Sequence, residues 1–202
     1  MEIKDNKVGV PMEHYVSVFS SNDPEEMSRS SGVSYAYGAF TLKLMGRDVK
    51  VTWPDMEAVY VETGIKTKSN IRILAARLIM EGKLTPWNGK MLAYTEMPWG
   101  NVYEAQFNGR CIKRLAFVFG NTIDKFEAAC KELGGISAKG GDMAFDIPFI
   151  NGLTVRLIVW EGDDEFPPSS QILFSDNFPN AFTAEDIAVT GDIILDAMKG
   201  RW

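Results

Sequence analysis

Apolar and polar residues alternate in two neighbouring segments of the first half of the chain. Residues 40–44 (FTLKL) and 49–53 (VKVTW) place an apolar side chain at every second position, and residues 46–48 (GRD) separate them. A period of two is typical of strands with one buried face, and a short break that contains glycine joins such strands in a hairpin. The pattern therefore predicts a half-exposed β-hairpin that ends at Pro54.

A spacing of three to four between apolar positions predicts helices on both sides of this hairpin. Asp23 and Pro24 are typical N-cap and first-turn residues of a short helix that would stop before Gly32. Ser69 is expected to cap a second helix, which Gly82 ends. Further helices are expected over residues 11–20, 102–119 and 122–133, with an irregular stretch at 83–100 that holds one strand near 91–95.

The last third of the chain has the strongest alternation. Residues 142–150 predict a strand with one buried face, and residues 153–160, apolar almost throughout, predict a strand covered on both faces. A third strand is expected over residues 171–174, and a terminal helix should run from Thr183 to about Lys199. Strands that are separated from helices in this way favour the α+β class over a doubly wound sheet.

The expected architecture is a single α+β domain over residues 1–202, with two lobes of about 1–100 and 101–202 as the alternative. It comprises N-terminal helices and a β-hairpin, central helices, and a C-terminal antiparallel β-meander followed by a terminal helix. The content of 46% apolar and 24% charged residues is that of a globular protein. A chain of this length buries roughly 70% of its unfolded surface, so its core needs no disulfides.

The net charge, the apolar runs and the cysteines of the chain limit the partners and the compartment that we expect for it. A net charge of −6 would on average repel phosphates, so we expect no nucleic-acid partner. No apolar run is long enough to cross a bilayer and no signal peptide is visible, which predicts a cytoplasmic protein without membrane contact. Two isolated cysteines, Cys111 and Cys130, predict buried thiols in a reducing compartment rather than a disulfide framework.

The acidic loop at residues 161–165 (EGDDE) is the first candidate for chemistry. Its carboxylates lie between two apolar strands, and hard cations such as Ca²⁺ and Mg²⁺ take oxygen ligands. Asp163 and Glu165, with Asp142, are therefore candidate ligands of a divalent cation. The spacing does not match an EF-hand loop. A solvated connection that protects a hydrophobic hairpin from edge pairing is the preferred interpretation.

Two arginines are candidates for binding an anion. Arg156 lies in an otherwise apolar strand, where an unpaired arginine is costly. It is expected to pair with Asp146 on the neighbouring strand, although both side chains could instead orient an anionic ligand in a cleft. Arg110 lies close in sequence to an aromatic stretch and could anchor an anion there.

That aromatic stretch contains Trp87, Tyr94, Trp99 and Tyr103 around proline and glycine residues. Aromatic side chains on irregular backbone can line a ligand pocket or form a satellite core under a long loop. The two interpretations are nearly balanced, with packing slightly favoured. Trp99 and Tyr103, together with Trp160 beside the acidic loop, are the aromatic candidates for ligand binding.

Other motifs do not support a catalytic site. His14 is the only histidine, so it has no second imidazole with which to ligate a transition metal. Residues 134–141 (GGISAKGG) lack the Lys-Ser/Thr order of a phosphate-binding loop. The chain contains no iron–sulfur cluster or haem motif, so a divalent cation is the one cofactor that the sequence suggests.

Three segments resemble a family of bacterial and archaeal proteins known as domain of unknown function 3786. They are GGDMAFD at residues 140–146, RLIVWEGDDEFPPS at residues 156–169 and TAEDIAVTG at residues 183–191, with weaker matches at residues 23–27 and 107–110. The resemblance implies a shared fold, and a link to anaerobic metabolism through relatives joined to iron–sulfur segments. It draws attention to Asp142, Trp160, Gly162, Asp163, Glu165, Pro167, Glu185 and Asp186.

Two hypotheses of function follow. The favoured one is a non-catalytic accessory protein of anaerobic metabolism, which binds a small molecule or a partner protein through its aromatic stretch and acidic loop. The alternative is a divalent-cation-dependent enzyme that uses the acidic loop 161–165. A purely structural subunit is a third class.

Overall fold

One antiparallel sheet runs through the whole molecule. The computed structural model describes residues 9–201, and within them nine strands pair in the order β4-β3-β2-β7-β8-β9-β5, with β1 added to β2 and β6 added to β7. The predicted α+β class is confirmed. The strands are β1 (Ser34–Ala36), β2 (Ala39–Leu44), β3 (Arg47–Thr52), β4 (Ala58–Tyr60), β5 (Met91–Ala93), β6 (Ile136–Ser137), β7 (Met143–Ile150), β8 (Leu153–Trp160) and β9 (Ser169–Ser175).

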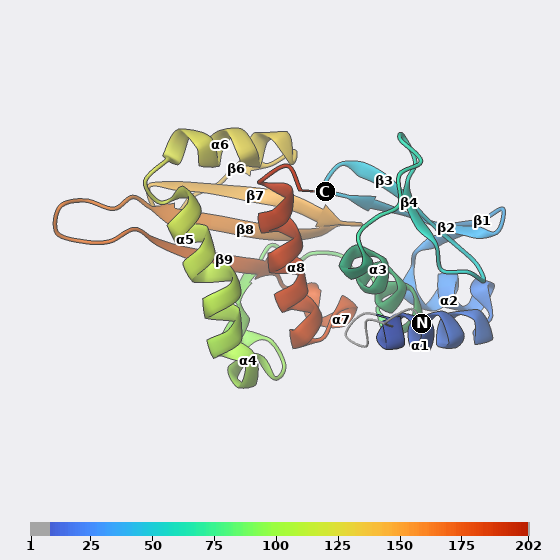
Figure 1. Cartoon of the computed structure of the whole chain (residues 1–202). Helices are drawn as coiled ribbons and strands as arrows, with labels where there is room; N and C mark the ends of the chain where they lie inside the picture. The colour runs from blue at the N-terminus through green and yellow to red at the C-terminus, as the bar shows by residue number, and fades with distance from the viewer. Residues whose placement is uncertain (1–8, 202) are drawn as a thin grey trace, which may run out of the picture.

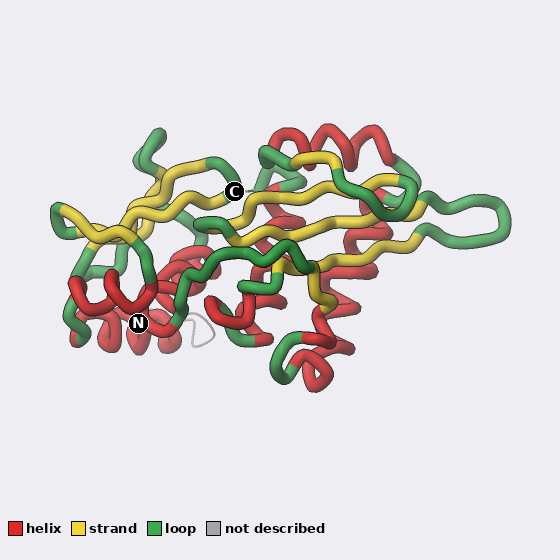
Figure 2. The backbone as a smooth tube through the Cα atoms, turned by 180° about the vertical axis from the view of Figure 1, so that it is seen from behind, coloured by secondary structure: helices red, strands yellow, loops and turns green. Residues whose placement is uncertain are grey.

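Helices cover one face of the C-terminal part of the sheet. In Figure 1, α5 and α8 lie in front of β7, β8 and β9, and in the reverse view of Figure 2 no helix lies in front of these strands. No helix of residues 9–201 is long and apolar enough to cross a membrane. The helices are α1 (Gly9–Ser21), α2 (Pro24–Ser31), α3 (Ser69–Glu81), α4 (Gly100–Phe107), α5 (Lys113–Phe119), α6 (Ile123–Glu132), α7 (Phe178–Ala181) and α8 (Ala184–Ala197), with a 3₁₀ turn at Tyr94–Glu96.

The predicted hairpin forms from β2 and β3, and its turn is shorter than expected. Leu42 pairs with Val49 and both side chains are buried, as the alternation requires. The turn consists of Met45 and Gly46, with φ angles of 45° and 81°, so the next two residues already belong to β3. Positive φ at both central positions is typical of a type I′ turn, a common two-residue hairpin turn whose twist matches that of the strands.

A short contact between β2 and β7 joins the two parts of the sheet. Leu44 pairs with Ile150, and the amide of Met45 donates to the carbonyl of Phe149 at 2.7 Å. Asn151 strengthens the junction, since its Oδ1 accepts from the amide of Lys43 at 2.7 Å. The N-terminal strands and the C-terminal meander therefore form one continuous sheet.

The two N-terminal helix starts differ in how well the sequence predicted them. Asp23 caps α2 as expected, because its Oδ1 accepts from the amide of Glu26 at 2.8 Å. The prediction that Ser69 caps α3 is wrong. Lys68 occupies the N-cap position and has no side-chain capping bond, while its Nζ donates to the carbonyl of Arg201 at 2.6 Å. The helix therefore starts one residue earlier than predicted, at a position where Lys68 makes a tertiary contact.

The single helix expected over residues 102–119 is interrupted. A π-helical segment, Asn108–Ile112, lies between α4 and α5. It brings Cys111 against α8, where a Cβ atom on Gly191 would lie 2.6 Å from Cys111 Sγ. Single π-turns are rare and are not marked by apolar periodicity, so the interruption could not be predicted from the hydrophobic pattern.

Both cysteines are buried free thiols, and we expect them to be unreactive in the folded protein. Desolvation raises the pKa of Cys111 to about 12 and also raises the pKa of Cys130. The thiolate is the nucleophile, so a thiol-specific chromogenic reagent at pH 8 should titrate neither cysteine before unfolding and both in denaturant. Stoichiometric labelling of the native protein would contradict this expectation.

Candidate functional site

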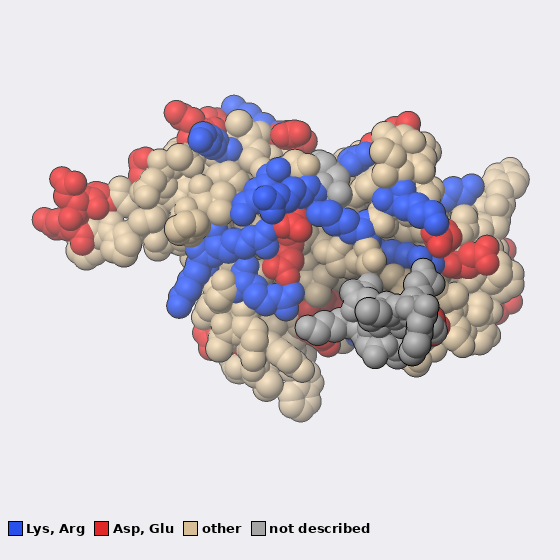
Figure 3. All heavy atoms as spheres, viewed as in Figure 1, with Lys and Arg blue, Asp and Glu red and all other residues tan. Residues whose placement is uncertain are grey.

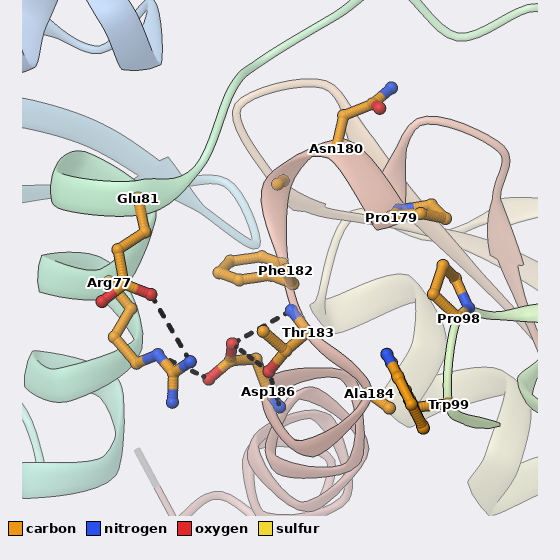
Figure 4. A pocket seen from close by; sticks show the side chains of 11 residues that line it. Arg77, Glu81, Pro98, Trp99, Pro179, Asn180, Phe182, Thr183, Ala184 and Asp186 are labelled. Carbon is orange, nitrogen blue, oxygen red and sulfur yellow. Dashed lines mark hydrogen bonds and ion pairs between the residues drawn. The ribbon is translucent and has the colours of Figure 1, made fainter.

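A cavity of about 280 Å³ opens where α3 meets the segment before α4 and the start of α8 (Figure 4). Three parts of the chain that are far apart in sequence contribute its walls. Arg77 and Glu81 lie on the α3 side, Asp186 lies at the start of α8, and Trp99 and the two prolines lie on the opposite side. The lining residues are Arg77, Glu81, Pro98, Trp99, Pro179, Asn180, Ala181, Phe182, Thr183, Ala184 and Asp186.

A buried ion pair lies at this cavity. Nε of Arg77, from α3, is 3.2 Å from Oδ1 of Asp186, from the first turn of α8, and the Asp186 side chain is only 7% exposed. The Arg77 Nε–H does not reach hydrogen-bond geometry, so the attraction between the two groups is mainly Coulombic. Burial of a carboxylate is tolerated when its lone pairs are used and its charge is paired.

Asp186 also closes the first turn of α8. Its Oδ2 accepts from the amide of Thr183 at 3.1 Å and from Thr183 Oγ1 at 2.7 Å. Thr183 and Asp186 thus form a capping box, which satisfies amide groups that the helix itself leaves free. One carboxylate therefore fixes both the start of α8 and its contact with α3.

Trp99 forms the wall opposite the ion pair. Its side chain is 78% exposed, and its backbone has the left-handed φ of 64°. Such a backbone persists in a residue with a large side chain only where the neighbouring structure enforces it. Here Gly100 packs directly on Tyr94, since a Cβ atom on Gly100 would lie 1.9 Å from the Tyr94 carbonyl oxygen.

The cavity offers groups of both charges to a ligand. Glu81 Oε2 lies 3.6 Å from Arg77 Nη2, and the Glu81 side chain is 59% exposed. In the view of Figure 4, Phe182 lies between Glu81 and Trp99, and Asn180 also lines the cavity. A guanidinium, an accessible carboxylate and an indole face can together orient a small polar molecule.

The family model described as domain of unknown function (DUF3786) matches residues 23–197. The chain belongs to this family. No curated protein and no solved structure matched the chain. The match includes every residue that lines the cavity, so the site lies within the domain that defines the family.

The acidic loop, one of the segments that resemble this family, forms the tip of the β8–β9 hairpin. Asp163 Oδ1 accepts from the amides of Glu165 at 2.8 Å and Phe166 at 2.7 Å. These bonds, with that from Phe166 the larger cause, lower the pKa of Asp163. Trp160 lines a shallow hollow with Phe166 at the base of the loop.

The candidate metal ligands are not assembled into one site. Asp142 Oδ2 accepts from the amide of Glu161 at 2.8 Å, and Asp163 binds the amides of its own turn. Among residues 9–201, no three carboxylate, histidine or cysteine side chains are grouped so that they could hold a metal ion. Asp142 and Asp163 stabilise the loop through backbone contacts.

Both arginine candidates lie in ion pairs. Arg156 Nε and Nη2 donate to the two carboxylate oxygens of Asp146 at 2.7 and 2.9 Å, across the predicted β7–β8 pairing. This is the cross-strand pair that the sequence favoured. Arg110 contacts Asp192 of α8, and it does not line the cavity that Trp99 lines.

The four residues of the aromatic stretch have different environments. Tyr94 is buried and stacks on Phe107 with ring centroids 4.1 Å apart, while Trp87 and Tyr103 are exposed and do not line the Trp99 cavity. Trp99 is thus the one ligand-binding candidate that lines it. Sequence reasoning missed Arg77 and Glu81, for which a helix face with an i, i+4 pair of opposite charge was the only signal.

Proposed function

We propose that the protein binds a small organic molecule that carries both an ammonium and a carboxylate group. The observation that carries the proposal is the pair Arg77 and Glu81, presented on successive turns of α3 at a cavity walled by Trp99. Opposite charges 3.6 Å apart match a zwitterion better than a simple anion or cation. Glu81 is the carboxylate that can contact a ligand, because the Asp186 carboxylate is already bound to Thr183 of α8 and to Arg77.

Size and surface support a metabolite rather than a larger ligand. A cavity of about 280 Å³ is at the small end of ligand sites, which span roughly 300–1,000 Å³. The ammonium group would lie between Glu81 and the indole face of Trp99, since aromatic faces attract cations. The carboxylate group would face Arg77, whose fork of N–H donors suits planar acids. We place such a binding protein among the accessory proteins of anaerobic metabolism.

A thermal-shift panel tests this assignment. Zwitterionic amino acids should raise the melting temperature, whereas their amides and their deaminated acids should not. At a hundred times the Kd, binding adds about 2.7 kcal/mol to stability, which for a chain of this size corresponds to roughly 5–11 °C. Glu81→Gln should abolish the shift without preventing folding, because Glu81 is largely exposed.

Glu127→Gln is the matched control for that variant. Glu127 forms the same i, i+4 contact with Lys131 on α6, at 2.8 Å, away from the cavity. This control should retain the full ligand-induced shift. The proposal fails if no zwitterion stabilises the protein, or if Glu81→Gln responds as strongly as Glu127→Gln.

A further inference from the structure

The loop between β8 and β9 projects from the body of the protein as an acidic arm, which we define as residues 161–168. In Figure 1 it extends beyond all helices, and in Figure 3 its carboxylates form an isolated acidic tip. The arm carries Glu161, Asp163, Asp164 and Glu165, all exposed. Phe166, at the same tip, is 68% exposed.

The arm is ordered by specific contacts. At its base, the amide of Gly162 donates to the carbonyl of Gly120 at 3.1 Å, at the end of α5. Pro168 packs so closely that a Cβ atom on Gly120 would lie 2.2 Å from the Pro168 Cβ. At its tip, the amide of Asp163 donates to the carbonyl of Phe166 at 2.9 Å. Because little order remains to be gained, such an arm can bind a partner at low entropic cost.

Basic side chains form a band over α5, the end of α8 and the start of α3 (Figure 3). Arg114 contacts both Asp192 and Asp196, and Lys68 Nζ lies 3.5 Å from Asp196 Oδ2. Lys68, Arg110 and Arg114 contact these two carboxylates, and Lys199 is close enough to interact with Asp196. With Lys113 next to Arg114 in α5 and Arg201 near Lys199, cations outnumber carboxylates here, although the net charge of the chain is −6. The basic band comprises Lys68, Arg110, Lys113, Arg114, Lys199 and Arg201.

An exposed aromatic residue lies beside this band. Phe117 is 89% exposed, and on α5 it follows Lys113 by four residues and Arg114 by three, so the three share one helix face. The acidic arm has the complementary composition: carboxylates next to exposed Phe166. Each surface thus combines charge of one sign with an unpacked aromatic side chain.

We propose that two copies of the chain associate, with the acidic arm of each copy docked on the basic band and Phe117 of the other. Charge complementarity selects a second copy as the occupant, since the chain itself carries both surfaces. The arm points away from its own basic band and so leaves it open to a partner (Figures 1 and 3). Phe166 would pack on Phe117 of the other copy, while Asp164 and Glu165 would face Lys113.

The position of the arm favours a closed dimer over a chain of copies. Its base is bonded to Gly120, one turn beyond Phe117, so the base of the arm lies next to one end of the band on the same protomer, while its tip points away. A two-fold axis between two such protomers allows both contacts to form together, as in most homo-oligomers. Since the contact is largely electrostatic and exposed, it should weaken as added salt shortens the Debye length from about 10 Å at 0.1 M to about 3 Å at 1 M.

Sedimentation velocity combined with charge reversal tests the dimer. The wild-type chain should sediment at twice its 22.5 kDa at low salt and as a monomer near 1 M salt. Arm variant Asp164→Lys/Glu165→Lys and band variant Lys113→Glu/Lys199→Glu should each be monomeric at low salt. Among the described residues, these four side chains form no ion pair, so both variants should keep the wild-type melting temperature.

Mixing the two variants gives the decisive outcome. In a heterodimer, the reversed arm of one variant meets the reversed band of the other, and the unchanged arm of the second meets the unchanged band of the first. Both contacts then join opposite charges, so heterodimers should form. Phe166→Ser should weaken the wild-type dimer at least tenfold, whereas Tyr37→Ser, at an exposed hairpin turn elsewhere, should not. A wild-type monomer at low salt, dimeric single variants, or a mixture that stays monomeric would each overturn the proposal.

Discussion

Asp186→Ala is expected to lower the free energy of unfolding by about 3 kcal/mol, as is typical when one partner of a buried ion pair is removed. Arg77 would remain largely buried without its carboxylate, and α8 would lose its capping box with Thr183. For a chain of this size the melting temperature should fall by roughly 6–12 °C. Urea unfolding followed by far-UV circular dichroism measures the change.

A double-mutant cycle with Arg77→Met separates the ion pair from the cap. Methionine keeps the apolar stem of the arginine, so the double variant should be more stable than the sum of the single losses predicts, by about 1–3 kcal/mol. The reason is that neither charge is left buried alone. Strictly additive losses would show that Arg77 and Asp186 do not stabilise each other, and that Asp186 acts only through Thr183.

Local features of the fold were predictable because nearby residues determine them. The cap of α2 by Asp23 needs only its own first turn, and the β2–β3 hairpin needs only alternation and a turn. The start of α8 at Thr183 was predictable for the same reason. The local prediction failed at Lys68, which contacts Arg201, and in the π-helical segment, where Cys111 lies against Gly191.

The candidate site shows the same division. Trp99 could be identified because a tryptophan on irregular backbone is visible in one segment of sequence. Arg77 and Asp186 could not be paired, since each alone resembles an ordinary helical charge and only the packing of α3 against α8 brings them together. Asp146 and Arg156 were paired correctly because strand register relates them through a short hairpin.

Gly100→Ala is expected to impair both stability and ligand binding. The new methyl group would lie 1.9 Å from the Tyr94 carbonyl oxygen and 2.9 Å from its carbonyl carbon, so the backbone itself must move. The start of α4 would shift away from Tyr94, which weakens the stacking of Tyr94 on Phe107 and displaces Trp99 from the cavity wall. We expect a loss of about 3 kcal/mol, at the upper end for overpacking because no rotamer change relieves it.

Gly109→Ala provides the matched control from the same helical run. Apart from its chain neighbours and the backbone of its own helix, no atom lies within 4 Å of the position that its methyl group would take, so this variant should be neutral or more stable, by up to about 1 kcal/mol. Urea unfolding should therefore separate the two alanine variants by roughly 3–4 kcal/mol, and zwitterion binding should fail in Gly100→Ala alone. Equal stability of the two variants would mean that Gly100 does not hold α4 against Tyr94. If Gly100→Ala lost stability but still bound the ligand, Trp99 would not belong to the binding site.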